Sequence, residues 1–485
     1  MNLEEKLKKY FADMLVYKSP EQSKFFATLS LPCFLRDWLV KKFSNENGEI
    51  NLEEVSNYIK KYIPRKEQWE QIKYAMSQKG EEVKFLAKVR VEVDITDRET
   101  IFYLPDFGYP KKKKETVIDK EVLIKNEKNL LTDNEVWGIV DLACYDDSFG
   151  KTRVHMVDFK PFCPYDVDLE YFQEARKYFT IAEWLDVLLL SIDYNPTGFI
   201  DKIQKTTLLS RLLPFVEKRV NLIEFSPKGT GKSYMYSQLS KYGWLVSGGS
   251  ITRAKLFYDL QKNTEGLIKN HDYVVLDEIQ SIIFPNPEEI QGALKGYLES
   301  GEYRIGNHRG IGEAGVILLG NIKEDLMNAE LDMFQDLPEI FHESALLDRM
   351  HGFIKGWDIP RMKENMKANG WALNVEYFSE ILHLLRDDLR YRAIVDEILE
   401  VPKSADTRDT EAIKRLCTGL LKIFFPCVKN ANDIDLNEFQ EYCLSPALQM
   451  RSIIKKQMGI FDKEFRGKEI PEIRCKLLTE SRPYE

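Results

Sequence analysis

The sequence has 485 residues, of which 44% are hydrophobic and 30% are charged, and glycine and proline contribute only 26 and 19 residues. This composition is ordinary for globular proteins and the chain is long enough for roughly three domains, which excludes collagen-like, wholly disordered and small disulfide-stapled proteins. The formal net charge of −9 excludes a uniformly basic surface, so any binding of nucleic acid has to come from a local patch.

The chain shows no sign of membrane insertion or export. Its longest apolar runs, such as 187–190 and 316–319, are far shorter than the roughly 18 residues that a transmembrane helix needs. The first nine residues are charged and lack the apolar segment of a secretory signal. The seven cysteines are scattered, without a C-x-x-C pair, which favours reduced thiols. We therefore expect a cytoplasmic protein without a membrane partner.

The hydrophobic pattern changes twice along the chain. Apolar positions at helical spacing are followed by short alternating runs that predict several strands, with an OB-like barrel as one candidate. A capping box of Thr180 and Glu183 predicts a helix that begins at Ile181. Later, strands and helices alternate, which predicts an α/β fold with a doubly wound parallel sheet behind an α+β N-terminal domain. The predicted parts are a helical subdomain (1–80), a strand-rich subdomain with a linker helix (81–197), an α/β core (198–370) and a helical lid with a tail (371–485).

A glycine-rich loop follows the apolar run 221–225 and precedes a helical stretch. Its residues are Ser226, Pro227, Lys228, Gly229, Thr230, Gly231, Lys232 and Ser233. They match a P-loop, except that Ser226 stands where the first glycine is usual. In a P-loop the backbone amides bind phosphate, the lysine contacts the β and γ phosphates and the last hydroxyl binds Mg²⁺. The loop therefore predicts a site for ATP and Mg²⁺, with a simple glycine-rich turn as the alternative.

Two later segments carry candidate catalytic residues. The apolar run 273–276 ends in Asp277, which we expect to bind Mg²⁺, and Glu278, which we expect to polarise the attacking water. The apolar run 316–319 is followed by Asn321, whose amide could orient that water. The alternative for Asn321 is an ordinary turn residue.

Two arginines are further candidate catalytic residues. Arg349 follows an apolar segment and is a candidate arginine finger for a neighbouring subunit, unless it only pairs with Asp348. Arg408 lies in the first turn of a predicted helix whose apolar stripe runs from Ile413 to Phe424. The motif order resembles the AAA+ ATPases: P-loop, Asp-Glu pair, sensor asparagine, arginine finger and helical lid. In that comparison Arg408 resembles the sensor 2 arginine, with a plain helix-start residue as the alternative.

Two longer stretches, 157–196 and 207–233, resemble the Lon-related BrxL family of bacterial BREX phage-defence systems. The resemblance implies a ring of identical subunits, hexameric or stacked, with an AAA+ core similar to MCM helicases. It also implies binding to DNA, partnership with other BREX defence proteins and a part in phage restriction.

Longer members of this family carry a Lon-like protease domain after the lid, whereas this sequence stops at Glu485, soon after Phe425. We therefore expect a short form without the protease domain. Two other functions stay open at this point. One is a Lon-type, ATP-dependent protein remodeller or protease-related factor, and the other is a nucleotide-controlled assembly scaffold for defence proteins.

Two basic segments are candidates for DNA binding. The strands 302–305 and 312–316 flank a predicted hairpin whose tip carries Arg304, His308 and Arg309, and MCM-like proteins point such a hairpin into the ring channel. A lysine run in the strand-rich region consists of Lys111, Lys112, Lys113 and Lys114. Solvated surface loops are the alternative for both.

A metal nuclease site is a weaker candidate. Asp141 precedes Asp158 and Lys160 at a spacing that fits the D…D-x-K pattern of metal nucleases. However, Phe159 and Phe162 favour packing of this segment against the ATPase core. The interpretation that we prefer for this stretch is therefore structural.

Overall fold

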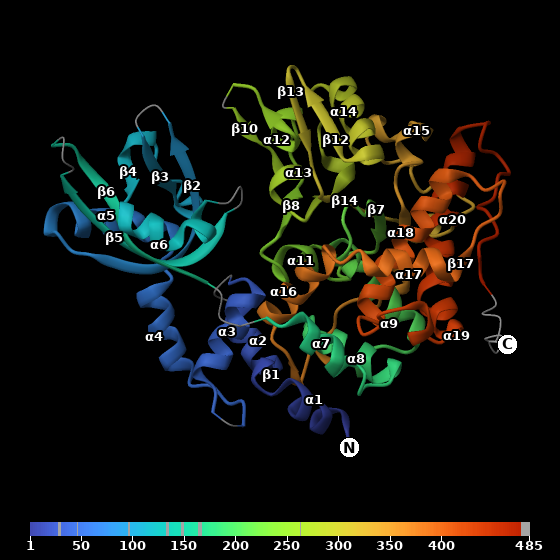
Figure 1. Ribbon diagram of the computed structural model, residues 1–485, viewed down its shortest axis with the longest axis horizontal. Helices are drawn as coiled ribbons and strands as arrows, with labels where there is room; N and C mark the ends of the chain where they lie inside the picture. The colour runs from blue at the N-terminus through green and yellow to red at the C-terminus, as the bar shows by residue number, and fades with distance from the viewer. Residues whose placement is uncertain are drawn as a thin grey trace, which may run out of the picture. The chain divides into compact units, whose positions relative to one another are not determined.

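The chain folds into two compact units in a computed structural model (Figure 1). The structure describes residues 1–27, 31–45, 47–95, 98–131, 135–146, 150–162, 167–261 and 263–476. The larger unit combines Met1–Lys41 with Val167–Glu485, and the inserted unit is Lys42–Asp166. The N-terminal segment therefore belongs to the larger unit and is separated from the rest of it in sequence by the inserted unit.

These borders differ from those at residues 80 and 197 that the sequence pattern predicts, and one strand pair shows why. β1 (Leu15–Lys18) pairs antiparallel with β16 (Gly370–Leu373), and the helices α1 (Leu3–Phe11), α2 (Pro20–Ala27) and α3 (Cys33–Phe43) flank β1 in sequence. This pairing joins residues more than 350 positions apart, which a sequence pattern does not reveal.

The inserted unit is built on one five-stranded sheet in the order β3-β2-β5-β6-β4. Its elements are β2 (Val83–Asp94), β3 (Glu99–Tyr103), β4 (Thr116–Ile118), β5 (Val136–Asp146), β6 (Thr152–Pro161), α4 (Leu52–Tyr62), α5 (Trp69–Lys79) and α6 (Lys120–Leu130). The hydroxyl of Thr116 donates to the carbonyl of Phe102 at 2.7 Å, so the sheet curls and its two edge strands meet there. The predicted strands are confirmed. Phe159 packs within this unit's own core, so its expected packing against the ATPase core is wrong.

A five-stranded parallel sheet forms the centre of the larger unit, in the order β15-β7-β14-β11-β8. Its strands are β7 (Leu222–Ser226), β8 (Gly243–Ser247), β11 (Tyr273–Asp277), β14 (Gly315–Asn321) and β15 (Gly352–Lys355). The residues of β7 and β11 are buried on both faces, which explains why these strands read as continuous apolar runs. The predicted parallel sheet is therefore confirmed.

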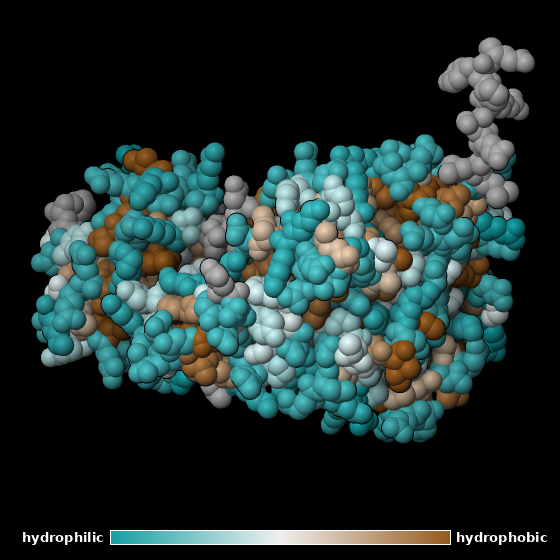
Figure 2. All heavy atoms as spheres, turned by 90° about the horizontal axis from the view of Figure 1, so that it is seen from below, coloured by the Kyte–Doolittle hydropathy of each residue, from teal (hydrophilic) through white to brown (hydrophobic). Residues whose placement is uncertain are grey.

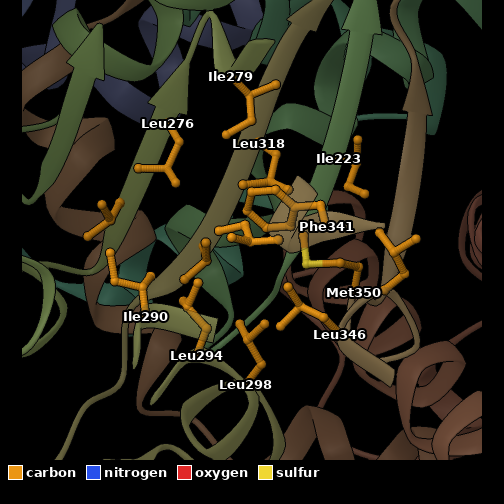
Figure 3. Packing of buried hydrophobic residues seen from close by; sticks show 14 of the residues in the cluster. Ile223, Leu276, Ile279, Ile290, Leu294, Leu298, Leu318, Phe341, Leu346 and Met350 are labelled. Atoms are coloured by element: carbon orange, nitrogen blue, oxygen red, sulfur yellow. The ribbon is translucent and has the colours of Figure 1, made fainter. Parts of the chain in front are cut away.

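Helix α14 (Pro287–Ser300) covers one face of this sheet (Figure 3). Its buried residues Ile290, Leu294 and Leu298 recur at helical spacing and share one core with the strand residues Leu276 and Leu318. The helix ends at Ser300, because Gly301 takes a positive φ of 81°. Asn286 precedes the helix, but its side chain makes no capping hydrogen bond.

The remaining elements surround the sheet of the larger unit. The capping box of Thr180 and Glu183 is confirmed at the start of α8 (Ile181–Ser191). The predicted lid helix is α18 (Thr407–Phe424), and its apolar stripe is buried. The other helices are α7 (Leu169–Arg176), α9 (Lys202–Leu209), α10 (Leu213–Val216), α11 (Lys232–Gln238), α12 (Arg253–Leu256), α13 (Leu267–Asn270), α15 (Ser344–Leu347), α16 (Val375–Arg386), α17 (Arg390–Ile398), α19 (Leu436–Phe439) and α20 (Ser445–Phe461). The short strands are β9 (Tyr258–Asp259), β10 (Thr264–Glu265), β12 (Glu302–Ile305), β13 (His308–Ile311), β17 (Leu399–Glu400) and β18 (Arg474–Cys475).

The surface is mostly hydrophilic on the face seen in Figure 2, with hydrophobic side chains in separate patches. Ile200 and Leu389 are among the most exposed hydrophobic residues. Within the described ranges, no helix combines the length and the apolar character that a membrane crossing requires. The described cysteines carry free thiols, and Cys163 lies outside the described residues.

Candidate functional site

The glycine-rich loop connects β7 to α11, as the sequence predicts. Gly229 and Gly231 take positive φ values of 86° and 74°, which favour glycine. A Cβ on Gly231 would lie 2.3 Å from the hydroxyl of Tyr194, so no larger residue fits there. Ser226 is buried and has no positive φ, and its Oγ accepts a hydrogen bond from Oγ1 of Thr230 at 3.1 Å. A serine can therefore occupy the position where the P-loop pattern usually has glycine.

Four of the predicted residues meet at the carboxyl edge of the sheet. Nζ of Lys232 lies 2.8 Å from Oδ1 of Asn321 at the end of β14. Oγ of Ser233 donates to Oδ2 of Asp277, at the end of β11, at 2.6 Å. Because β14 lies between β7 and β11, the strand order itself brings these side chains to the loop.

Lys232 lies in an environment that acts on its pKa in two opposite directions. Burial lowers the pKa of Lys232, while Glu224, Asp277 and Glu278 act in the opposite direction. Its ammonium group is thus enclosed without a direct carboxylate partner among the described residues. Such a group gains from a bound anion, and triphosphate is an anion of suitable charge.

Glu278 has an unusual backbone conformation. Its φ of 52° lies in the left-handed region, which a non-glycine residue rarely adopts. The backbone N–H of Glu278 donates to Oδ1 of Asp277 at 2.9 Å, and the residue is exposed. Strain of this kind persists where the surrounding structure fixes it, and it is common at functional sites.

Sequence reasoning missed two supporting residues of this edge. Nε2 of Gln280 donates to the backbone carbonyl of Asn321 at 2.8 Å and so fixes the end of β14. Behind the loop, Arg211 forms a fully buried ion pair with Glu224 at 2.6 Å and donates to the carbonyl of Thr230 at 2.9 Å. The sequence held one signal for the ion pair, a glutamate inside the apolar strand 222–226, because a buried carboxylate requires a charged or hydrogen-bonding partner.

A cavity of about 540 Å³ lies beside the loop. Its lining combines aromatic and apolar side chains with a few polar groups, and includes Phe26, Arg36, Asp193, Gly231, Tyr234 and Met362. Because Gly231 belongs to both the cavity and the loop, a ligand with phosphates on the loop could extend a ring system into the cavity. The first 41 residues contribute to this lining, which the sequence did not reveal.

Arg349 and Arg408 lie together, on a second pocket of about 250 Å³. Nε of Arg349 is 2.7 Å from Oε2 of Glu299, and Nη2 of Arg408 is 3.3 Å from the same oxygen. Although burial opposes the charged form, Asp348 and Glu299 raise the pKa of Arg408. The alternative pairing of Arg349 with Asp348 is not formed, because Asp348 pairs with Arg408 and Arg451.

This arginine pocket is remote from the P-loop of the same chain. The carbonyl of Arg349 accepts a hydrogen bond from the side chain of Asn221, just before β7, whereas the P-loop begins at Ser226, the last residue of β7. The strand rises by about 3.3 Å per residue, so the two ends are about 15 Å apart. The backbone of Arg349 therefore lies at the opposite end of β7 from the P-loop, and Arg408 lines the same pocket as Arg349.

The predicted hairpin exists, but its strands differ from the expected ones. The second strand is β13, whereas the expected strand 312–316 is wrong because its residues from Gly315 onward begin β14 of the central sheet. Arg304 and Arg309 are direct cross-strand partners, and Arg309 also pairs with Glu302 at 2.7 Å. Both arginines are exposed.

His308 does not extend freely from the hairpin. Its ring stacks on Tyr258 with centroids 3.6 Å apart, and Nε2 is 3.2 Å from a carboxylate oxygen of Glu265. The hairpin β12–β13 is thereby packed on the neighbouring hairpin β9–β10 (Figure 1). His308 thus joins two hairpins, which reduces its availability to a ligand.

The other predicted basic and acidic groups lie in the inserted unit. Lys111, Lys112 and Lys114 are exposed near β4, and the side chain of Lys113 lies outside the described residues. Asp141 and Asp158 are cross-strand partners, and each is paired with a lysine, at 2.7 Å and 3.4 Å respectively. Among the described residues there is no cluster of three or more histidine, cysteine, aspartate or glutamate side chains suited to a metal ion.

Comparison with known families places residues 154–470 in the class of Lon-like ATPase domains. A family model described as "Lon-like protease BrxL-like, ATPase domain" matches residues 154–470, and one described as "BREX system Lon protease-like protein BrxL N-terminal" matches residues 9–144. The chain belongs to the BrxL family, which confirms the resemblance seen in its motifs.

Two curated relatives, both named Lon-like protease BrxL, cover nearly the whole chain. The protein of Escherichia coli O9:H4 (strain HS) is 28% identical over 465 residues, which are 94% of this chain and 65% of the relative. The protein of Bacillus cereus (strain H3081.97) is 28% identical over 464 residues, which are 94% of this chain and 67% of the relative. The chain therefore spans about two thirds of the length of the curated relatives that it matches.

Proposed function

We propose that this chain is an AAA+ ATPase that hydrolyses Mg·ATP in a ring of identical subunits, binds DNA through its hairpins and acts in a BREX phage-defence system. The observation that carries the proposal is the convergence of Lys232, Ser233, Asp277 and Asn321 on one edge of a parallel sheet. The strand order and the loop between β7 and α11 support the AAA+ assignment.

The residues at this edge fit a magnesium-bound triphosphate. Ser233 and Asp277 offer a hydroxyl and a carboxylate, and Mg²⁺ prefers oxygen ligands while it keeps several waters and phosphate oxygens. The bound ion would neutralise charge on the phosphates. Lys232 binds the β and γ phosphates, Asn321 orients the attacking water and Glu278 accepts its proton.

The active site is completed by a second subunit. The backbone of Arg349 lies about 15 Å from the P-loop along β7, and Arg408 lines the same pocket, so we infer that both arginines act on the nucleotide of a neighbour. Positive charge placed on the γ phosphate from outside increases hydrolysis strongly in P-loop enzymes. Hydrolysis thus depends on assembly of the ring.

DNA binding is assigned to Arg304 and Arg309 on the hairpin β12–β13. The two exposed guanidinium groups face the same side of the hairpin, and a ring repeats them in every subunit. Such a band binds phosphates by releasing counterions, whatever the net charge of the whole protein.

The test is phosphate release from ATP by the purified protein, with Lys232→Ala as the variant and Lys403→Ala, an exposed lysine outside the site, as the matched control. The control should keep the wild-type rate, whereas Lys232→Ala should lose it by about 100-fold or more. A Lys232→Ala protein that hydrolyses ATP at the wild-type rate would refute the assignment.

A protein-remodelling function is the second candidate, because the curated relatives are named Lon-like proteases. An unfolded protein substrate such as casein would then stimulate the ATPase, and DNA would not. An assembly scaffold would instead form nucleotide-dependent oligomers with almost no turnover. Comparing ATP turnover with DNA, with casein and with neither separates the three functions.

A further inference from the structure

One carboxylate, that of Glu299, contacts both arginines of the second pocket. Its Oε2 lies 2.7 Å from Nε of Arg349 and 3.3 Å from Nη2 of Arg408. The N–H at Nε of Arg349 is buried and has no well-aligned hydrogen-bond acceptor among the described residues, so its contact with Glu299 is an ion pair only. Arg349 thus keeps a donor that a better-placed acceptor could use.

The contacts on the two sides of Arg408 differ in strength. On one side Asp348 is only 6% exposed and also pairs with the fully buried Arg451 at 2.6 Å, so this contact is fixed. On the other side Glu299 is 46% exposed. Exposed ion pairs contribute little and are broken readily, whereas breaking a buried pair is costly. Arg408 is therefore anchored by Asp348 and only loosely held by Glu299.

We propose that Glu299 is a latch that holds Arg349 and Arg408 in a resting position until a neighbouring subunit presents a triphosphate. Phosphate oxygens carry more negative charge than one carboxylate and can accept paired hydrogen bonds from a guanidinium group, so they displace Glu299. This inference rests on the proposed function, because it needs the two arginines to act on the neighbour's nucleotide. Release of the two arginines therefore depends on ATP that is bound to the neighbouring subunit.

The experiment is phosphate release measured over a series of subunit concentrations for Glu299→Gln and for Glu411→Gln. Both residues line the same pocket and lose the same charge, but Glu411 pairs with Arg392 rather than with the two arginines. Glutamine keeps the helix propensity of glutamate, and Glu299 lies near the carboxyl end of α14, where a negative charge is unfavourable. Glu299→Gln should therefore fold.

Glu299→Gln should raise the rate per subunit by about two- to fivefold, most at low subunit concentration, while Glu411→Gln should match the wild type. In an Arg349→Ala/Arg408→Ala background the Glu299 substitution should have no further effect, because no arginine remains to be released. An unchanged or lower rate for Glu299→Gln, or an equal rise for Glu411→Gln, would overturn the latch alone. A wild-type protein without ATP turnover would overturn the latch and the proposed function together.

Discussion

The Nζ of Lys232 lies 2.8 Å from Oδ1 of Asn321, although the two residues are 89 positions apart in the chain. The register of the sheet causes this contact, since Asn321 on β14 pairs with Ser226 on β7, where the loop begins. Asn321 therefore connects the end of β14 to Lys232, the residue that we propose to bind phosphate.

Replacing Asn321 by alanine should impair hydrolysis more than binding. The backbone of β14 stays fixed by Gln280, so only the amide group is lost. We expect turnover to fall by about 100-fold while affinity for a fluorescent ATP analogue changes little. A variant that loses affinity and keeps its maximal rate would contradict the role given to Asn321.

Mixing two inactive variants should restore activity if the arginines act between subunits. Lys232→Ala damages the P-loop side of an interface and Arg349→Ala the opposite side, so random mixing of equal amounts leaves about a quarter of the interfaces intact on both sides. We expect a corresponding recovery of phosphate release. The control is a mixture of Lys232→Ala with Glu278→Gln, which damages the same side twice and should stay inactive. Failure of the first mixture to recover would argue against shared sites.

The buried pair of Arg211 and Glu224 should be important for stability. Glu224→Gln removes the partner of a buried guanidinium group, which costs about 3–5 kcal/mol in comparable cases. Glu313→Gln is the matched control, since Glu313 pairs with Lys218 at the surface and should cost less than about 1 kcal/mol. Denaturant unfolding measures the free energy of unfolding of both variants. Equal losses would show that the buried pair contributes no more to stability than the surface pair.

Hairpin arginines should control the salt dependence of DNA binding. Arg304→Ala together with Arg309→Ala should weaken binding and make affinity less sensitive to salt, by about one counterion for each lost phosphate contact. Glu302→Gln releases Arg309 from its ion pair and should tighten binding. Fluorescence anisotropy of labelled DNA over a series of salt concentrations measures this, and an unchanged slope in the double variant would assign binding elsewhere.

Glu376 should make stability depend on pH. Burial raises its pKa from 4.5 to about 7, although Lys241 opposes the shift. The folded state then holds this proton more tightly than the unfolded state, so the stabilising contribution is complete below pH 4.5 and is lost as pH rises through 7.

Glu376→Gln should therefore gain stability relative to the wild type as pH rises across that window. Thermal unfolding at a series of pH values compares the two proteins, with Glu380→Gln, a more exposed partner of the same Lys241, as the control. Parallel curves for Glu376→Gln and the wild type would contradict the prediction.

The sequence predicted well which residues meet at the edge of the central sheet, because the loop 226–233, Asp277 and Asn321 each lie at the end of a buried apolar run, and such runs indicate parallel strands. It could not assign 312–316 correctly, because this stretch, with two glycines and Glu313, does not show whether it continues the hairpin or leads into the next strand. Glu299 and Gln280 were missed because nothing in their local sequence distinguishes them from other polar residues. Their roles come only from the partners that folding brings to them.

The pairing of Leu15 with Leu373 also has a consequence for synthesis on the ribosome. At roughly 5–20 residues per second, β1 waits about 20–70 s before its partner strand has been made. During that time the inserted unit can fold, because its core is contained within residues 42–166. Meanwhile β1 lacks its strand partner. A deletion variant that lacks the inserted unit should accordingly join Lys41 to Val167. Truncation from the amino terminus would instead also remove β1.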